Sequence, residues 1–153
     1  LHLTGVELKQ RIMKTVKPWP ALRNKISTGG IANAYFALTN TQAPPDPEDP
    51  ANWESRELSF STEHPYKAKD LKEFEVSLPE AKQISLYFQK YDTESGYDTI
   101  SFYDRAGSKL AEISGYSTEV FTQVFSTNYI KVVFKSDDSV QKYGFDITKA
   151  AYR

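Results

Sequence analysis

The chain lacks cysteine altogether and has only two histidines, His2 and His64, among its 153 residues. Without cysteine it can form neither a disulfide scaffold nor a thiol nucleophile. None of its serines occupies a Gly-x-Ser-x-Gly or Gly-Thr-Ser setting. A Ser-His-Asp triad needs an imidazole next to an activated serine and an oxyanion hole. We therefore predict that this chain by itself is not an enzyme.

An excess of charge and a long apolar run are also missing. The 19 Lys and Arg residues nearly balance the 20 Asp and Glu residues, which gives a formal net charge of -1. Nucleic acids and anionic membranes select clustered basic residues, so neither is a predicted partner. No apolar run reaches the roughly 18–20 residues that cross a bilayer. The first residues, LHLTGVELKQ, have no signal-peptide pattern, and we expect any export signal to lie upstream of them.

Aromatic residues, by contrast, are abundant, with ten tyrosines and nine phenylalanines. This composition favours a β-rich core. From residue 56 onward apolar and polar residues alternate, which places the apolar ones on one face of a strand. Turn residues separate the alternating segments, so we predict a mainly β fold, an antiparallel β-sandwich over residues 56–153. The alternating sets are Phe74/Val76/Leu78, Ile84/Leu86/Phe88, Ile100/Phe102, Ile130/Val132/Phe134 and Phe145/Ile147.

The first forty residues have a different, helical pattern. Thr4 and Glu7 have the spacing of a capping box, and apolar residues then recur at i, i+4. We predict a helix over residues 4–17, ended by the proline that follows, and a shorter helix over 33–38. Short helices are marginal in isolation. We therefore expect this segment to pack against another body or against the sandwich.

A proline-rich acidic linker separates the two patterns. Four of the eight prolines fall between Pro44 and Pro50, interleaved with aspartate and glutamate. Proline stiffens a chain toward polyproline II, and like charges extend it. The predicted organisation is a helical segment over 1–40, a linker over 41–55 and a sandwich domain over 56–153.

The helical segment contains the motif L-T-x-x-E-L-K, followed by T-G-G and by N-A-x-x-A-L. These motifs resemble the last two helices of subtilisin-like serine proteases, in the same order. The resemblance implies that residues 1–40 are the C-terminal helices of such a catalytic domain, whose serine, aspartate and histidine lie upstream. The matching residues are Leu3, Thr4, Glu7, Leu8, Lys9, Ile12, Thr28, Gly29, Gly30, Asn33, Ala34, Ala37 and Leu38.

The sandwich region contains the segments STEHPY, YDTESGYD and FKSDDS and ends with Gly144-Phe145 and a final strand pattern. These segments resemble the CUB domain over nearly the full length of 56–153. The resemblance implies a jelly-roll sandwich. It departs from the animal pattern in lacking every cysteine of that family's disulfides. We expect aromatic packing to replace them, by Tyr87, Phe88, Phe102, Tyr103 and Phe145.

Calcium-binding CUB domains use a glutamate, the aspartate of Tyr-Asp, and the aspartate and serine of Ser-Asp-x-Ser. The resemblance assigns these roles to Glu94, Asp98, Asp137 and Ser139, with calcium as the cofactor. The next ligand of the family falls on Val140, which offers only its carbonyl. Calcium takes about 6–8 oxygens, so backbone groups and water must complete the shell. The alternative is that such acids only cap loops, as we expect for two others, Asp104 and Asp138.

Together these resemblances imply a non-catalytic accessory domain at the C-terminus of a secreted bacterial subtilisin-like serine endopeptidase. Its expected partners are the parent catalytic domain and a protein or glycan surface of the substrate. The alternative is a structural or maturation domain that stabilises the protease and has no ligand of its own. A sandwich of the pre-peptidase C-terminal type would fit that second role.

Overall fold

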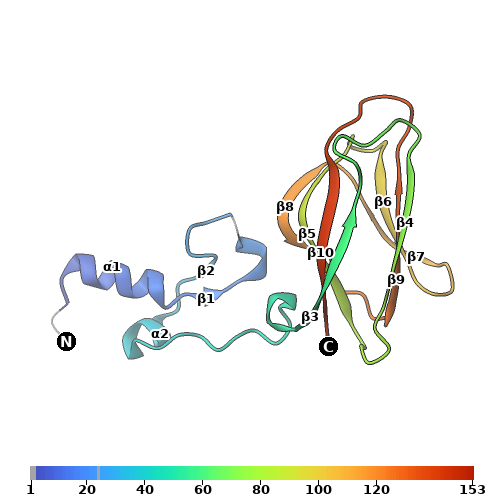
Figure 1. Ribbon diagram of the computed structural model, residues 1–153. Coiled ribbons are helices and arrows are strands. Elements are labelled where there is room, and N and C mark those ends of the chain that lie inside the picture. The colour runs from blue at the N-terminus through green and yellow to red at the C-terminus, as the bar shows by residue number, and fades with distance from the viewer. Residues whose placement is uncertain (1–2, 24) are drawn as a thin grey trace. The chain divides into compact units, whose positions relative to one another are not determined.

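The computed structural model describes residues 3–23 and 25–153 (Figure 1). The chain divides into two compact units, Leu1–Asn52 and Trp53–Arg153. Among the described residues, no helix has both the length and the apolar character that a membrane crossing requires.

The first unit begins with helix α1 (Gly5–Lys14), and the predicted capping box is present. The Glu7 N–H donates to the Thr4 hydroxyl at 3.3 Å, and the Thr4 N–H donates to the Glu7 carboxylate at 2.8 Å. The predicted end at residue 17 is wrong. The Thr15 side chain and N–H both bond to the Arg11 carbonyl, at 2.8 and 3.0 Å, and close the last turn. Strand β1 (Lys17–Pro18) then pairs with β2 (Gly30–Ile31).

Helix α2 (Ala34–Thr39) begins after Asn33, whose side chain accepts the Phe36 N–H at 3.2 Å. Short 3-10 turns occupy Pro20–Leu22 and Pro50–Asn52. The second turn lies inside the predicted linker, where Asp49 is buried and pairs with Arg23. The expectation of an extended chain is therefore wrong at this point, because a partly buried ion pair holds the linker to its own unit.

The second unit consists of two four-stranded antiparallel sheets, which face each other in Figure 1. The predicted antiparallel β-sandwich is confirmed. Except for β6 and β7, consecutive strands lie in different sheets. In spatial order, one sheet holds β3 (Glu54–Ser61), β10 (Gly144–Tyr152), β5 (Ile84–Asp92) and β8 (Tyr116–Phe121). The other holds β4 (Leu71–Ser77), β9 (Tyr129–Lys135), β6 (Thr99–Tyr103) and β7 (Lys109–Ile113).

The five alternating patterns lie in β4, β5, β6, β9 and β10, whereas β3, β7 and β8 were not predicted individually. These three are edge strands, as is β4, whose alternation is clear enough to recognise. An edge strand buries little of its surface and often carries charge, which discourages pairing with other chains. Low burial and exposed charge are clearest in β3, where Glu54, Arg56 and Glu57 are all exposed. The periodicity of β3, β7 and β8 is therefore too weak to recognise.

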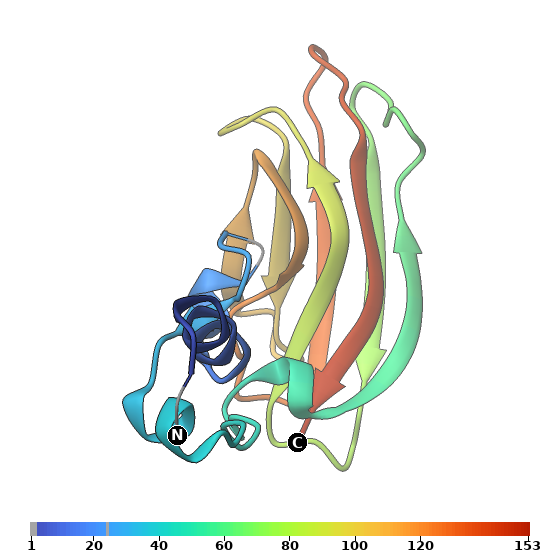
Figure 2. The same ribbon diagram turned by 90° about the vertical axis from the view of Figure 1, so that its left-hand side faces the viewer.

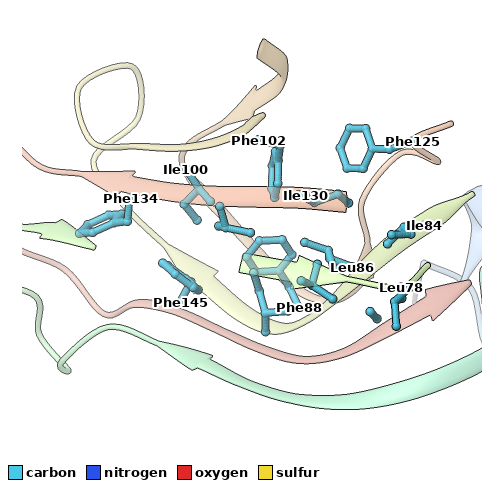
Figure 3. Packing of buried hydrophobic residues seen from close by; sticks show 14 of the residues in the cluster. Leu78, Ile84, Leu86, Phe88, Ile100, Phe102, Phe125, Ile130, Phe134 and Phe145 are labelled. Atoms are coloured by element: carbon cyan, nitrogen blue, oxygen red, sulfur yellow. The ribbon is translucent and has the colours of Figure 1, made fainter. Parts of the chain in front are cut away.

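The core lies between the two sheets, where phenylalanines from both meet edge to face (Figure 3). Phe145 contacts Phe88 and Phe134 with ring centroids 6.0 and 5.9 Å apart. Such pairs are worth roughly 0.5–1.5 kcal/mol beyond the area that they bury. They stabilise the sandwich without disulfides, as predicted for Phe88, Phe102 and Phe145, which are fully buried.

The prediction is wrong for Tyr87 and Tyr103, which are only half-buried. Tyr87 precedes the buried Phe88, and Tyr103 follows the buried Phe102. Because neighbouring side chains on a strand point to opposite faces, both tyrosines point away from the core. Tyr87 instead packs on Phe121 at 4.9 Å, under the Lys149 ammonium. Their places in the core are taken by Tyr66, Phe125 and Phe134.

Strand β10 begins at Gly144, whose φ is +92°. A Cβ there would lie 1.8 Å from the buried Thr62 hydroxyl, which accepts the Phe145 N–H. We expect Gly144→Ala to lower the free energy of unfolding by about 2–5 kcal/mol, from left-handed strain and overpacking combined. Urea denaturation measures this loss. Gly107→Ala is the control, because φ is +83° there but no atom lies within 4 Å. Equal losses in the two variants would contradict the steric argument.

Candidate metal centre

Three loops meet at the end of the sandwich opposite its C-terminus (Figures 1 and 2). They connect β3 to β4, β5 to β6, and β9 to β10. The segment 93–98 forms the second loop and 136–143 the third. Since consecutive strands lie in different sheets, these loops cross the open end of the sandwich. Residues about forty positions apart in sequence are thus brought together.

Three of the predicted ligands converge in these loops. Glu94 and Asp98 follow β5, and Asp137 follows β9. Each offers one carboxylate oxygen, and these oxygens all lie within 4.8 Å of one another. Asp98 is fully buried, and the other two are half-buried. Clustered carboxylate oxygens are the donors that hard cations such as calcium prefer.

Asp98 is fixed by hydrogen bonds on both carboxylate oxygens. One oxygen accepts the Asp137 N–H at 2.8 Å, and the other accepts the Tyr66 hydroxyl. Its backbone is held as well, because the Thr93 hydroxyl donates to the Asp98 carbonyl at 2.9 Å. The Asp98 N–H donates to the Glu94 carbonyl at 3.0 Å. The geometry of this carboxylate is therefore set by the protein.

Tyr66 is a site residue that sequence reasoning missed. Its ring is buried against Phe134, with centroids 5.0 Å apart. Its hydroxyl donates to Asp98 and accepts the Glu94 N–H at 3.2 Å. Burial and the Asp98 acceptor raise the pKa of Tyr66 to about 12, so the hydroxyl keeps its proton. The STEHPY segment indicates a turn into a strand, but it carries no signal for the direction of this hydroxyl.

Ser139 is hydrogen-bonded to Asp137. Its N–H and hydroxyl reach the same Asp137 oxygen, at 2.8 and 3.3 Å. Asp137 thus caps its own loop, which is the alternative role that the sequence analysis considered for these acidic residues. That alternative is confirmed for Asp104, which accepts the Ser108 N–H at 2.8 Å. Asp138 is also a solvated loop residue, with its side chain 72% exposed.

Glu94 carries the main electrostatic cost of the cluster. Its Oε2 atom is buried and has no hydrogen-bond partner among the residues that the structure describes. This burial, with the negative charges of Asp137 and Asp98, raises the pKa of Glu94, and Lys142 offsets only part of the effect. An unpaired buried carboxylate oxygen is unfavourable. A cation between the three carboxylates would offset the repulsion between their negative charges and would give the Glu94 Oε2 atom a partner.

In buffer that contains a chelator, we expect Glu94→Gln to be more stable than the unmodified chain, by a margin that grows as pH rises above the ordinary pKa of a glutamate. Because the pKa of Glu94 is raised in the folded state, folding takes up a proton near that pKa. The stability that protonated Glu94 gives to the folded state is present at low pH and is lost as pH rises through the raised pKa. Urea denaturation at several pH values measures the margin.

Glu112→Gln is the matched control for this pH series. Its pKa is lowered by hydrogen bonds from Lys109 and Ser101. The stability linked to that carboxylate is present above the ordinary pKa of a glutamate and is lost only as pH falls through the lowered pKa. Above the ordinary pKa, the cost of removing Glu112 should therefore not change with pH. A margin for Glu94→Gln that does not change with pH would contradict the proposed cost of ionising Glu94.

The fold and the acidic loops define the class of protein, an antiparallel β-sandwich module. The family profile of the CUB domain matches residues 51–148. The chain therefore belongs to the CUB domain family, as its motifs predicted. CUB domains are non-catalytic modules of extracellular proteins that typically bind other proteins.

One solved structure supports the fold. The CUB1-EGF-CUB2 domains of rat MASP-1 align with a TM-score of 0.53 and 19% identity, covering 63% of this chain and 40% of that one. The chain thus corresponds to less than half of the rat protein chain. A crystal structure of the MASP-1 CUB2 domain bound to Ca2+ aligns with a TM-score of 0.48 and 18% identity, covering 60% and 88%. No curated protein sequence matches the chain.

Proposed function

We propose that the sandwich is a calcium-stabilised binding module in which Glu94, Asp98 and Asp137 are the ligand carboxylates. The observation that carries this proposal is the buried, unpartnered Oε2 atom of Glu94 beside two further carboxylates. Loop caps alone would not account for it, since a capping carboxylate is satisfied by backbone N–H groups. An all-oxygen site of this kind suits calcium, which tolerates mixed carboxylate, carbonyl and water ligands.

Ser139 is the fourth proposed ligand. Its hydroxyl bond to Asp137 is the longer of its two contacts with that side chain, at 3.3 against 2.8 Å. The hydroxyl can therefore leave Asp137 while the N–H keeps the loop in place. Calcium would tie the loop after β5 to the loop after β9. Tyr66 would hold Asp98 in position from the loop between β3 and β4.

The calcium proposal is tested by titration in solution. Chelator-treated protein, observed by NMR during addition of calcium, should show amide shifts confined to residues 94–98 and 137–139. Asp137→Asn should abolish them. Shifts spread evenly over the sandwich, or none at millimolar calcium, would contradict the site.

The proposed context is a secreted bacterial subtilisin-like protease, with residues 1–40 as the end of its catalytic domain, 41–55 as linker and 56–153 as accessory domain. Apart from the motifs of residues 3–38, one observation supports it. Neither α1 nor α2 contains a buried residue, and Val6 and Leu38 are 67% and 79% exposed. A helical unit that buries no apolar side chain of its own needs another body to pack against. The remainder of the catalytic domain would be that body.

Hydrogen exchange tests this context. In the present chain the amides of α1 and α2 are expected to exchange much faster than those of β5 and β9, because the helices lack a core. A longer chain that includes the upstream catalytic domain should protect the two helices. Equal protection of helices and strands in the present chain would contradict the need for a missing body. A gene whose upstream sequence lacks a Gly-Thr-Ser motif would contradict the parent protease.

The role in that protease is to bind a protein or glycan surface of the substrate. Removal of residues 41–153 from the whole enzyme should then reduce activity on large or insoluble substrates and spare small peptides. Loss of thermal stability with every substrate would instead indicate the structural role without a ligand.

A further inference from the structure

A recess of about 190 Å³ with both polar and apolar lining residues lies on the sheet formed by β3, β10, β5 and β8. Asp146 contributes to it and stands between Phe145 and Ile147, which both point into the core. The Asp146 side chain is therefore on the outer face of this sheet, whereas three further lining residues, Leu58, Phe60 and Ile147, lie in or against the core. The recess shares no residue with the candidate metal centre. Its polar lining residues are Ser59, Ser61, Gln89, Asp146 and Thr148.

The recess coincides with irregularities in three neighbouring strands, which lie side by side in Figure 2. The register between β10 and β3 shifts between Ile147 and Lys149. The register between β10 and β5 shifts at the same place and once more between Asp146 and Ile147. As a result, Ser59, Gln89 and Thr148 all stand outside the paired positions. Bulges interrupt the ladder and re-aim side chains, and they are enriched beside functional sites.

The side chains in the recess are available to a ligand. Within residues 3–23 and 25–153, the side chains of Ser59, Ser61, Gln89 and Thr148 make no hydrogen bond to the protein. Hydroxyl and amide groups can both donate and accept. Asp146 adds a carboxylate that is held in place, and preorganised groups lose less entropy on binding.

Asp146 is held from two sides. The His64 Nε2 atom lies 3.1 Å from one carboxylate oxygen, and the Tyr143 hydroxyl donates to the other. The imidazole stacks on the Tyr143 ring, with centroids 3.8 Å apart. Lys90 lies 4.0 Å from the Tyr143 ring centroid. Because the carboxylate already has these partners, the recess does not demand a cationic ligand.

We propose that this recess binds one neutral pyranose ring of a glycan. Adjacent hydroxyl groups of a sugar are mixed donors and acceptors, and they match the mixed polar groups around the recess. The size also fits, because a cavity of about 150 Å³ accommodates a benzene ring and a pyranose is somewhat larger. This site goes beyond the calcium-stabilised module proposed above and does not depend on calcium. An extended peptide is the other ligand that a sheet surface near the edge strand β3 could take.

The test is an NMR titration of the full chain in chelator-containing buffer, so that its outcome is separate from that of the calcium proposal. The probes are the methyl glycosides of glucose, galactose, mannose and N-acetylglucosamine, each added to 50 mM. At least one is expected to shift the amides of residues 89 and 146–148 with a dissociation constant of about 1–10 mM. Gln89→Ala and Thr148→Val should each weaken that binding about five- to tenfold.

Matched controls come from the neighbouring strand β8 and the residues after it. Gln123→Ala and Thr118→Val remove the same groups outside the recess and should leave binding unchanged. The proposal is overturned if none of the four glycosides shifts these amides. It is also overturned if binding survives unchanged in both recess variants. A response to an extended peptide along β3, with none to the glycosides, would assign the surface to peptides instead.

Discussion

Calcium at a hundredfold excess over its dissociation constant is expected to raise the melting temperature of the sandwich by about 10–20 °C. Binding to the folded state alone adds RT ln(1 + [L]/Kd), which is about 2.7 kcal/mol at this excess. For a domain of this size each kcal/mol moves the midpoint by roughly 4–8 °C. Extracellular sites commonly bind at about 0.1–1 mM, so tens of millimolar calcium suffice. Magnesium should do much less, because it demands a tighter octahedral shell.

Two variants of one loop make this experiment decisive. Asp137→Asn removes a charge from the cluster but keeps an oxygen to accept the Ser139 N–H. It should fold and lose the calcium response. Asp138→Asn makes the same chemical change on the exposed neighbour, which pairs with Lys69 at 3.5 Å. It should keep the full response. If both variants respond alike, or if magnesium equals calcium, the carboxylate cluster is not the binding site.

Replacing Phe88 by alanine is expected to lower the free energy of unfolding by about 3–5 kcal/mol. The ring is fully buried and contacts Tyr91, Phe102 and Phe145 at centroid distances of 5.3, 6.3 and 6.0 Å. Truncation removes this buried surface and leaves a cavity that rigid neighbouring strands cannot fill. Urea denaturation with and without calcium measures the loss.

Tyr87→Ala is the comparison, because Tyr87 is the preceding residue of the same strand and packs on the outer face. It removes a side chain of similar size from a half-buried site. We expect a loss of about 1–2 kcal/mol, since much of that ring is already in contact with water. Equal losses for the two variants would mean that Tyr87 is a core residue after all.

Tyr87 and Phe88 show how far sequence alone could predict the fold. Alternation identified the five strands whose inner faces are fully apolar, and with them most of the core. It assigned both aromatic neighbours to packing, although neighbouring side chains on a strand point to opposite faces. Three of the four edge strands were missed for the related reason that a half-exposed strand such as β3 carries charge over its first half. Pattern reasoning detects burial and therefore works best where burial is complete.

The candidate site divides in a similar way. Family motifs located Glu94, Asp98 and Asp137, and the fold brings them together. The same motifs could not reveal Tyr66, because its role depends on where a buried ring directs a hydroxyl across three loops. Nor could they show that Ser139 is engaged by Asp137. The direction of a side chain and the choice of its hydrogen-bond partner follow from tertiary packing and cannot be predicted from the spacing of residues in a motif.

The pairing of β10 with β3 has a consequence for how the domain is made. The last strand of the sandwich lies between the first strand and β5, and Tyr152 stands opposite Glu54. On the ribosome, β3 therefore has no partner until nearly a hundred further residues have been synthesised. Such non-local closure folds slowly and leaves open strand edges exposed in the meantime. The charges along β3 then protect the nascent chain from pairing with its neighbours before the sheet can close.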